Sequence, residues 1–262
     1  GKYKLKKLLN SIAPDIVHTH GSKTTSIVKS INKNAYKHIA TVHGIKKDIK
    51  VYESADFVIG VSENAISRIN TKKKVITNWW QPNLKKIESS KKEFALAVGR
   101  LEKVKGFDLL ISAWKNIKSN LVIIGSGQEK ESLSKLIKEY DLNNKIKIVD
   151  EIKSDELNNY YSKASVLIIS SINEGGPRVA LEALFLKIPV LSTNVGHMKQ
   201  IFPNEFLAEK NNVASLTKLL EDYVDDIDLL NQDAIFEYVK DEFSVEEKAR
   251  QTLDVYKDIL QS

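Results

Sequence analysis

The sequence has no cysteine among its 262 residues. Disulfide bonds, zinc sites built from thiolates and thiol nucleophiles are therefore excluded. No apolar run approaches the ~20 residues that a membrane-spanning helix needs, and no signal-peptide pattern is present. These absences lead us to expect a protein of the cytoplasm.

Several catalytic signatures are also missing. There is no Ser-His-Asp constellation and no phosphate-binding P-loop. Asp226-Ile-Asp228 matches a metal-binding Asp-x-Asp pattern, but it falls in a polar stretch away from every predicted strand end, which indicates solvated surface. His18 and His20 alternate onto one face of a predicted strand, yet no nearby carboxylate completes a metal site. We therefore predict no metal.

Positive charge is unevenly distributed. Residues 1–92 carry 19 Lys and Arg against 6 Asp and Glu, whereas residues 93–262 carry 21 against 28. The basic first part predicts an anionic partner, and an anionic lipid surface at the inner face of the membrane is one interpretation. A lysine-rich solvated surface is an equally weighted alternative. Nucleic acid is disfavoured, because there is no recognised binding motif and aromatic residues do not interleave with the lysine clusters.

Short apolar runs alternate with segments of helical spacing along the chain, which predicts parallel sheets with helices on both faces. Residues 78–92 lose this periodicity and gain polar and turn residues, so we place a linker between two domains there. We expect strands over 15–20, 39–43, 57–61, 75–77, 94–98, 121–124, 146–149, 164–170 and 189–192. We expect helices up to residue 12, over 22–32, from 62, and over 106–117, 128–140, 153–163, 177–187, 212–226, 228–240 and 244–261.

Two glutamates, Glu174 and Glu182, lie eight residues apart around a Gly-Gly-Pro corner. A predicted strand precedes them, and Pro177 suits the first position of a helix. Glu174 is therefore expected on a strand-to-helix loop and Glu182 in the helix, both near the carboxyl end of a strand, where open α/β sheets bind ligands. The alternative interpretation is a loop ion pair at Glu174 and a solvent-facing helix residue at Glu182.

A second strand-to-helix loop combines glycines with cations. Gly99 and Gly106 leave room for close approach of the backbone, and Arg100 and Lys105 lie between them. Such a pair can hold a diphosphate, with Arg as the planar fork and Lys as the point charge. An Arg and a Lys on a loop surface without function are the alternative.

Two more loops follow predicted strands. Gly125-Ser-Gly127 suits a phosphate or a nucleoside at a helix start, although a tight turn explains it equally well and the third glycine of a dinucleotide fingerprint is missing. His43 ends a strand just before Gly44, and its imidazole can donate to an oxygen of a bound substrate.

The ordered set of these segments resembles the retaining glycosyltransferases of family 4, which have the GT-B fold. Each motif alone is weak, but the combination is specific and runs across nearly the whole chain. The matching segments are residues 14–20, 42–44, 55–62 and 98–101, Lys105-Gly106, residues 125–127, and Glu174 through Glu182.

The resemblance implies an α/β fold of two Rossmann-like doubly wound parallel-sheet domains, the N-terminal one incomplete. Residues 1–88 would be part of an acceptor-side domain, residues 89–240 the nucleotide-sugar-binding domain, and residues 241–262 a helix that crosses back to the first domain. The family's first strands and their glycine-rich loop have no counterpart, and the first residue is Gly. We therefore expect that the chain begins inside a longer protein.

The resemblance also implies roles for the candidate residues. Glu174 would reach the donor sugar and Glu182 would bind the ribose diol, since ionised carboxylates only accept hydrogen bonds. Arg100 and Lys105 would stabilise the departing diphosphate in place of a metal. His43 would contact the donor sugar or diphosphate. Further contacts to the donor nucleotide and its phosphates are implied for Gly125, Gly127, Gly175, Gly176 and Pro177.

The resulting hypothesis is a retaining, metal-independent glycosyltransferase in bacterial surface polysaccharide synthesis. It would move a sugar from a UDP-linked donor to a saccharide or lipid-linked acceptor, with no cofactor besides that substrate. Front-face attack is expected, because no residue stands out as a double-displacement nucleophile. One alternative is an epimerase or phosphorylase on a related scaffold, which needs an acid–base pair or cofactor lysine that the sequence does not reveal. Another is a non-catalytic nucleotide-sugar-binding module.

Overall fold

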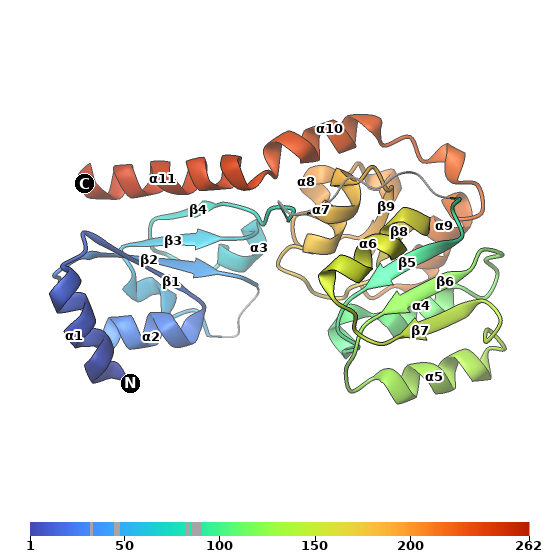
Figure 1. Cartoon of the computed structure of the whole chain (residues 1–262), viewed down its shortest axis with the longest axis horizontal. Helices are drawn as coiled ribbons and strands as arrows, with labels where there is room; N and C mark the ends of the chain where they lie inside the picture. Colours follow the sequence, from blue (N-terminus) through green and yellow to red (C-terminus); the bar gives the residue numbers. More distant parts are fainter. Residues whose placement is uncertain (32–33, 45–47, 82–83, 85–90, 262) are drawn as a thin grey trace. The chain divides into compact units, whose positions relative to one another are not determined.

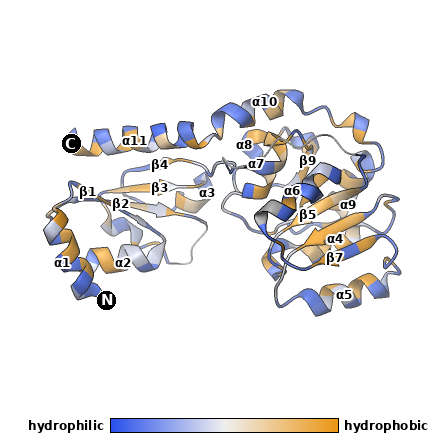
Figure 2. Cartoon of the chain, in the orientation of Figure 1, coloured by the Kyte–Doolittle hydropathy of each residue, from blue (hydrophilic) through white to orange (hydrophobic). Residues whose placement is uncertain are grey.

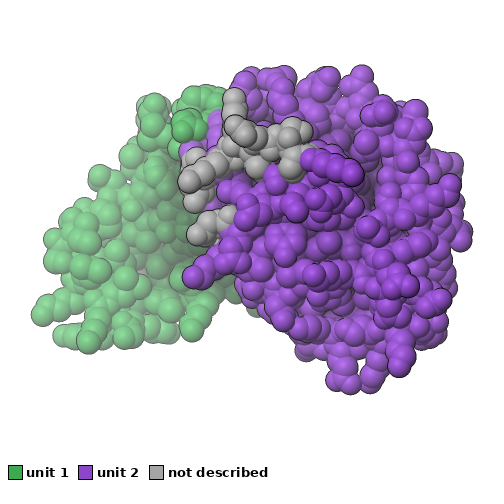
Figure 3. All heavy atoms as spheres, turned by 45° about the vertical axis from the view of Figure 1, so that its right-hand side comes forward, with its two compact units in different colours: residues 1–78, 246–262 green, residues 79–245 purple. Residues whose placement is uncertain are grey.

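The computed structural model describes residues 1–31, 34–44, 48–81, 84 and 91–261. They form two compact units, which Figure 3 colours separately. Unit 1 comprises Gly1–Asn78 with Glu246–Ser262, and unit 2 comprises Trp79–Val245. Within the described ranges, no helix is both long and apolar enough to cross a membrane.

Unit 1 is built on a parallel sheet with strand order β1-β2-β3-β4 (Figure 1). Residue His20 of β1 pairs with Thr41 of β2, so the carboxyl ends of these two strands meet at one edge of the sheet. This register brings the histidines at the two strand ends together. The elements of the unit are α1 (Lys2–Ile12), β1 (Ile16–His20), α2 (Ser22–Ile31), β2 (Lys37–Val42), a 3-10 turn (Tyr52–Ser54), β3 (Phe57–Gly60), α3 (Glu63–Ile66), β4 (Lys73–Val75) and α11 (Val245–Gln261).

The two faces of this sheet bury different helices, because successive residues of a strand point to opposite sides. Ile39 and Ile59 pack with Val255 and Ile259 of α11. The alternate residues pack on the other face with the 3-10 turn and α3. That second cluster contains Ala40, Val42, Tyr52, Ala55, Val58, Ala65, Ile66 and Ile69. The last helix of the chain therefore completes the core of the unit that the first residues begin.

Unit 2 holds a larger parallel sheet of strand order β10-β9-β8-β5-β6-β7. Its strands are β5 (Phe94–Val98), β6 (Leu121–Ile124), β7 (Ile146–Val149), β8 (Ala164–Ile169), β9 (Val190–Thr193) and β10 (Leu207–Ala208). Its helices are α4 (Phe107–Ala113), α5 (Lys130–Glu139), α6 (Ser154–Lys163), α7 (Arg178–Phe185), α8 (Met198–Ile201), α9 (Val213–Tyr223) and α10 (Asp233–Glu242). Figure 1 shows helices layered against this sheet.

Strands β5 and β6 of unit 2 are apolar along their whole length, as expected for a parallel sheet that is covered on both faces. All four residues of β6 are buried, and so are the three central residues of β5. Figure 2 shows these strands in the hydrophobic colour, whereas α5 and α11 alternate between hydrophilic and hydrophobic residues along their length. The helices thus bury one face and leave the other to solvent.

The strand order of unit 2 reverses beside β5. The chain passes from β5 outward to β6 and β7, and then returns to the other side of β5 as β8. Ligands of open α/β sheets bind outside the carboxyl ends of the strands at such a switch point. The loops that follow β5 and β8, residues 99–106 and 170–177, are therefore placed for binding.

The predicted architecture of two Rossmann-like parallel-sheet units is confirmed, but several element boundaries differ from the prediction. α4 ends at Ala113 rather than 117, because Trp114 and Ile117 form consecutive tight turns after it. α10 begins at Asp233 rather than 228, since residues 227–229 form a 3-10 turn. β4 spans 73–75 rather than 75–77, because its first two residues are exposed lysines that break the apolar pattern. Residues 82–83 and 85–90 of the predicted linker lie outside the described residues.

Candidate functional site

The two loops at the switch point of unit 2 are joined by hydrogen bonds. The N–H of Ile172 donates to the carbonyl of Val104 at 2.9 Å, and the Ser170 hydroxyl donates to the carbonyl of Lys105 at 2.9 Å. Gly106 has φ +62°, and a Cβ at this position would overlap the carbonyl oxygen of Ser170. The glycine therefore allows the loop after β5 and the loop after β8 to form one continuous surface.

Lys105 and Glu174 face each other across this surface as an ion pair. Their side chains are 19% and 16% exposed, so solvent screens the two charges only partly. The Ser171 hydroxyl donates to Glu174 Oε1 at 2.9 Å, and the Lys105 stem passes over Gly99, where a Cβ would lie 3.3 Å from its Cε. The loop ion pair considered as an alternative for Glu174 exists, and its partner is the lysine that was independently predicted for the site.

Arg100 lies on the same loop as Lys105 but makes a different interaction. Its guanidinium is paired with Glu102, two residues along the chain, and its side chain is 71% exposed. The structure therefore brings Lys105 and Glu174 together, and holds Arg100 on the adjoining loop surface against Glu102.

The corner Gly125-Ser-Gly127, after β6, packs directly on the loop after β5. A Cβ on Gly125 would overlap the carbonyl oxygen of Gly99, and one on Gly127 would overlap that of Leu101. The N–H of Gly125 donates to the carbonyl of Val149 at 2.9 Å, which extends the sheet ladder. The close approach between the two loops is thus the observed reason for glycine at 125 and 127, and ligand contact there stays a prediction.

The Gly175-Gly176-Pro177 corner precedes α7. The helix begins at Arg178, so Pro177 is the residue before the helix rather than its first residue, because its ψ of 108° is extended. Gly196, after β9, has φ +56°, and a Cβ there would lie 2.8 Å from the carbonyl oxygen of Gly175. The glycine corner therefore packs directly against the loop after β9.

Glu182 lies on α7 with its side chain turned into the core. The residue is 7% exposed, and its Oε2 accepts a hydrogen bond of 3.1 Å from the hydroxyl of Tyr161, which is fully buried. Burial raises the pKa of the Glu182 carboxyl, while the Tyr161 hydrogen bond and the nearby Arg178 charge oppose this rise. The solvent-facing position considered as an alternative for Glu182 is excluded by its burial.

Three histidines of unit 1 form a stacked row at the carboxyl ends of β1 and β2. The ring centroids of His18 and His20 are 4.6 Å apart, and those of His20 and His43 are 5.2 Å apart. His20 Nδ1 and His43 Nε2 are hydrogen-bonded at 3.0 Å. The hydroxyls of Thr41 and Tyr256 bond the two ring nitrogens of His18, and burial, aided by the neighbouring His20, lowers the pKa of His18 to about 4. The row is therefore anchored by a neutral imidazole.

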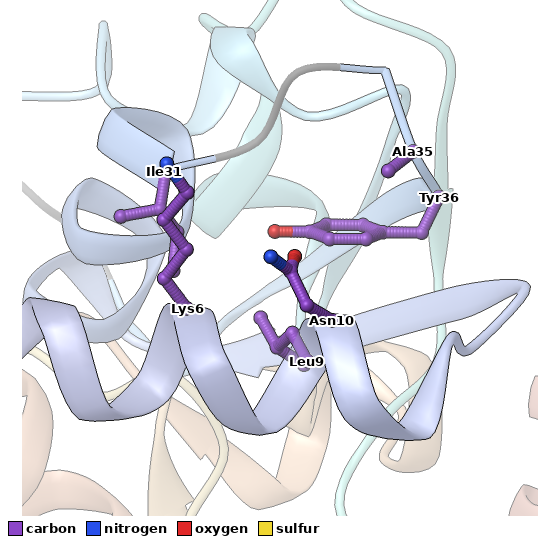
Figure 4. Close-up of a pocket in the computed structure, with 6 residues that line it drawn as sticks. All are labelled: Lys6, Leu9, Asn10, Ile31, Ala35 and Tyr36. Atoms are coloured by element: carbon purple, nitrogen blue, oxygen red, sulfur yellow. The ribbon is translucent and has the colours of Figure 1, made fainter.

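The described residues contain no group of three or more His, Asp or Glu side chains arranged to hold a metal ion. Unit 1 does contain a hollow of about 310 Å³ between α1 and α2. Figure 4 shows the Tyr36 ring lying over the Asn10 amide there. The hollow is lined by Lys6, Leu9, Asn10, Ile31, Ala35 and Tyr36, none of which belongs to the predicted site.

Three contacts in unit 2 were not predicted from the sequence. Ser171 bonds Glu174, Tyr161 bonds Glu182, and Gly196 packs on Gly175. The three-residue spacing between Ser171 and Glu174 is a local signal that could have suggested their hydrogen bond. Tyr161 and Gly196 lie 21 residues from their partners, and no local pattern indicates either contact.

The family model for glycosyl transferases group 1 matches residues 81–235, which include both loops of the switch point. The chain belongs to this family. Its members' fold, with two Rossmann-like parallel-sheet domains, agrees with the two units described above. Membership identifies the chain as a transferase of sugars.

Individual glycosyltransferases support this assignment. An uncharacterized glycosyltransferase of Methanocaldococcus jannaschii is 30% identical over 241 residues, covering 84% of this chain and 68% of the relative. The N-acetylgalactosamine-N,N'-diacetylbacillosaminyl-diphospho-undecaprenol 4-alpha-N-acetylgalactosaminyltransferase of Campylobacter jejuni is 32% identical, covering 52% of this chain and 38% of the relative. The crystal structure of Anabaena HepE in complex with UDP superposes with a TM-score of 0.86 at 17% identity, covering 98% of this chain and 82% of that one. That last likeness is one of GT-B fold.

Proposed function

We propose that this chain is a retaining, metal-independent glycosyltransferase that moves a sugar from a UDP-linked donor to a saccharide or lipid-linked acceptor in bacterial surface polysaccharide synthesis. The observation that carries the proposal is the ion pair between Lys105 and Glu174 at the switch point of unit 2. A cation for a diphosphate and a carboxylate for sugar hydroxyls thus lie side by side where α/β sheets bind nucleotides.

When the donor binds, contacts from Lys105 and Glu174 to the donor replace their ion pair with each other. The Lys105 ammonium moves from Glu174 to the diphosphate, and the Glu174 carboxylate then accepts hydrogen bonds from hydroxyls of the sugar. Arg100, which is largely exposed, turns from Glu102 to the same diphosphate as a bidentate donor. The two cations stabilise the charge that develops on the leaving group. His43 is a further proposed contact to the donor sugar or diphosphate, and Glu182 accepts from the ribose diol.

The chemical step is a front-face substitution at the anomeric carbon. The bond from this carbon to the diphosphate oxygen breaks while a bond to the acceptor oxygen forms on the same face. The acceptor hydroxyl gives its proton to the departing diphosphate, so no enzyme nucleophile is required. Positioning and stabilisation of the leaving group supply the rate enhancement.

The proposed nucleotide and the proposed acceptor are supported by two different similar proteins. UDP occupies the Anabaena HepE structure, which shares the fold, and this supports UDP as the nucleotide. The Campylobacter relative is named for an acceptor linked to diphospho-undecaprenol, which supports a lipid-linked acceptor. A chelator should leave transfer unchanged, because fixed cations take the place of a metal.

Lys105→Met and Glu174→Gln test the site. Each should lower kcat by about 10²–10³-fold, the usual cost of removing a group that stabilises the transition state. Lys103→Met is the matched control, because Lys103 lies on the same loop but is 71% exposed and pairs with Asp108. Transfer at the parental rate by both site variants would refute the assignment.

The product distinguishes the candidate reactions. NMR of the transferred sugar should show the anomeric configuration of the donor. Epimerisation of a nucleotide sugar without acceptor would instead favour the epimerase alternative. Heat of UDP binding without any turnover would favour a binding module.

We also propose peripheral contact between unit 1 and an anionic membrane. Support comes from the excess of 19 basic over 6 acidic residues in residues 1–92 and from apolar side chains exposed on the lysine-rich helix α1, namely Tyr3, Leu8 and Ile12. Co-sedimentation with phosphatidylglycerol vesicles should exceed that with phosphatidylcholine vesicles and should decline in about 0.5 M salt, because salt screens this attraction. Equal sedimentation with both vesicles would contradict the proposal.

A further inference from the structure

Tyr161 and Glu182 form a polar pair inside the core of unit 2. Tyr161 lies near the end of α6, and Glu182 lies on α7. Along the chain, β8 separates these two helices. The tyrosine is 0% exposed and the glutamate 7% exposed. Their hydrogen bond, from the Tyr161 hydroxyl to Glu182 Oε2, is 3.1 Å long.

Packing alone does not explain this pair. A buried phenol must find an acceptor, and a buried carboxylate is costly even when it is bonded. Apolar residues of similar volume at both positions are commonly neutral or stabilising in such cases. Leu181, Ala183 and Leu184, which flank Glu182 on α7, are apolar and completely buried. The chain therefore keeps a buried polar pair at a place where apolar residues would also pack.

The hydrogen bond from Tyr161 uses only one of the two carboxylate oxygens of Glu182. Oε2 receives the Tyr161 hydroxyl, and no hydrogen bond reaches Oε1 from any residue that the structure describes. The phenol stays protonated because burial and the neighbouring carboxylate raise the pKa of Tyr161 well above its ordinary value. It is thus a permanent donor that fixes the rotation of the carboxylate.

We propose that Tyr161 is a positioning residue, whose hydroxyl orients the Glu182 carboxylate toward the ribose diol of a nucleoside diphosphate. The inference depends on the proposed function, in which Glu182 binds the nucleotide. Tyr161 holds one oxygen of the carboxylate from inside the core, and the other oxygen accepts from the diol. A fixed carboxylate loses less rotational freedom on binding, which favours affinity.

The hydrogen bond also sets the charge of the carboxylate. Burial raises the pKa of Glu182, whereas the hydrogen bond from the Tyr161 hydroxyl of α6 and the positive charge of Arg178 on α7 lower it. A hydrogen bond to the ionised form favours that form. The diol needs an acceptor, so UDP affinity should fall as the pH drops through the pKa of Glu182. Losing the Tyr161 bond should move this fall to higher pH.

Calorimetric titration of UDP into the full chain, from about pH 5 to about pH 8, tests the proposal. Tyr161→Phe should weaken UDP binding about tenfold, the loss of one hydrogen bond to a charged group, and should raise the pH midpoint of binding. The neighbouring Tyr160→Phe is the matched control, since that ring packs against Phe94 instead. It should bind UDP as the parent does.

A ligand without the diol separates positioning from general damage. With 2′,3′-dideoxy-UDP, Tyr161→Phe and the parent should bind equally, whereas a disturbed core would weaken both ligands alike. In turnover, the variant should raise the KM for the donor and leave kcat nearly unchanged. Should the phenylalanine variant fail to fold, 3,5-difluorotyrosine at position 161 is a stronger donor and should move the pH midpoint downward.

An unchanged UDP affinity and midpoint in Tyr161→Phe, or equal losses for both ligands, would overturn the inference while leaving the proposed function in place. A parent chain that binds neither UDP, GDP nor ADP would refute the proposed function, and the inference with it. The two failures are therefore distinguishable.

Discussion

Glu182 is the residue at which folding and binding have opposite requirements: folding favours an uncharged side chain there, whereas the proposed binding of the ribose diol needs a carboxylate. A charged group in an apolar core costs free energy, and the rise in its pKa reports this cost. Glu174 shares the same strand-to-helix segment but keeps a cation and a hydroxyl beside it. The two glutamates thus differ in environment although the sequence presents them alike.

Glu182→Gln should stabilise the protein at neutral pH and weaken UDP binding. A carboxyl whose pKa is raised by folding contributes full stability only below its unfolded pKa, and this contribution is lost as the pH rises through the folded pKa. The melting temperature of the variant should therefore exceed that of the parent above the folded pKa. A gain of about 1 kcal/mol corresponds to about 2–4 °C.

The higher stability of Glu182→Gln should vanish in acid, at a pH below the pKa that Glu182 has in the unfolded chain. Thermal unfolding measured across this range checks the sign, and Glu131→Gln on the exposed face of α5 is the control. A variant less stable than the parent at neutral pH would contradict the argument.

Gly125→Ala should destabilise unit 2 by roughly 1–3 kcal/mol or more, because its Cβ would overlap the backbone of Gly99. Gly44→Ala is the control, since none of the residues that the structure describes comes within 4 Å of a Cβ at that position, and its effect should stay within about 0.5 kcal/mol. Urea unfolding of both variants measures the difference. Equal stabilities would show that the corner has more room than the structure indicates.

At the scale of elements, α11 shows how a terminal helix becomes part of a core. Val255 and Ile259 reach the sheet of unit 1 from the far end of the chain, and Tyr256 bonds His18 on β1. The helix therefore supports both the sheet and the stacked histidines. Its opposite side carries exposed residues such as Leu253 and Leu260.

Ile259→Ala should lower the free energy of unfolding of unit 1 by about 2–4 kcal/mol, because it empties a buried position. Ile259 is 5% exposed, whereas its neighbour Leu260 is 52% exposed. Leu260→Ala should therefore cost about 0.5 kcal/mol or less. Circular dichroism during urea unfolding compares the two, and a similar loss in both would mean that α11 does not complete the core.

At the scale of the whole molecule, the two units have separate hydrophobic cores. Their unfolding can also be followed separately, because the tryptophans lie in one unit only. All three tryptophans, Trp79, Trp80 and Trp114, belong to unit 2. The stacked histidines belong to unit 1. Two cores of this kind are expected to unfold as distinct cooperative units.

UDP should shift mainly the unfolding transition that tryptophan fluorescence reports, because all the proposed contacts except that of His43 lie in unit 2. At a concentration of about 100 times Kd, a ligand that binds only the folded form adds about 2.7 kcal/mol. Ile259→Ala should do the reverse, lowering the unit 1 transition without moving the tryptophan signal. Equal shifts of both transitions after either change would show that the units unfold as one.

Much of the fold and part of the site could be predicted from the sequence, because their signals are local. Continuous apolar runs such as 121–124 gave the strands, and their alternation with helices gave parallel sheets. The glycine corners and the Glu174 segment follow strands directly, so their place at strand ends was also predictable. Helix ends such as that of α4 were not, since tight turns continue the same apolar spacing.

The sequence by itself determined which residues lie at the carboxyl ends of strands, because that depends on short-range pattern. Only the tertiary structure decided which strand ends are neighbours. The return of the chain to β8 beside β5 brings Lys105 to Glu174, 69 residues away, and the packing of α6 and α7 brings Tyr161 to Glu182. Long-range pairs of this kind depend on strand order and core packing, which no local spacing encodes.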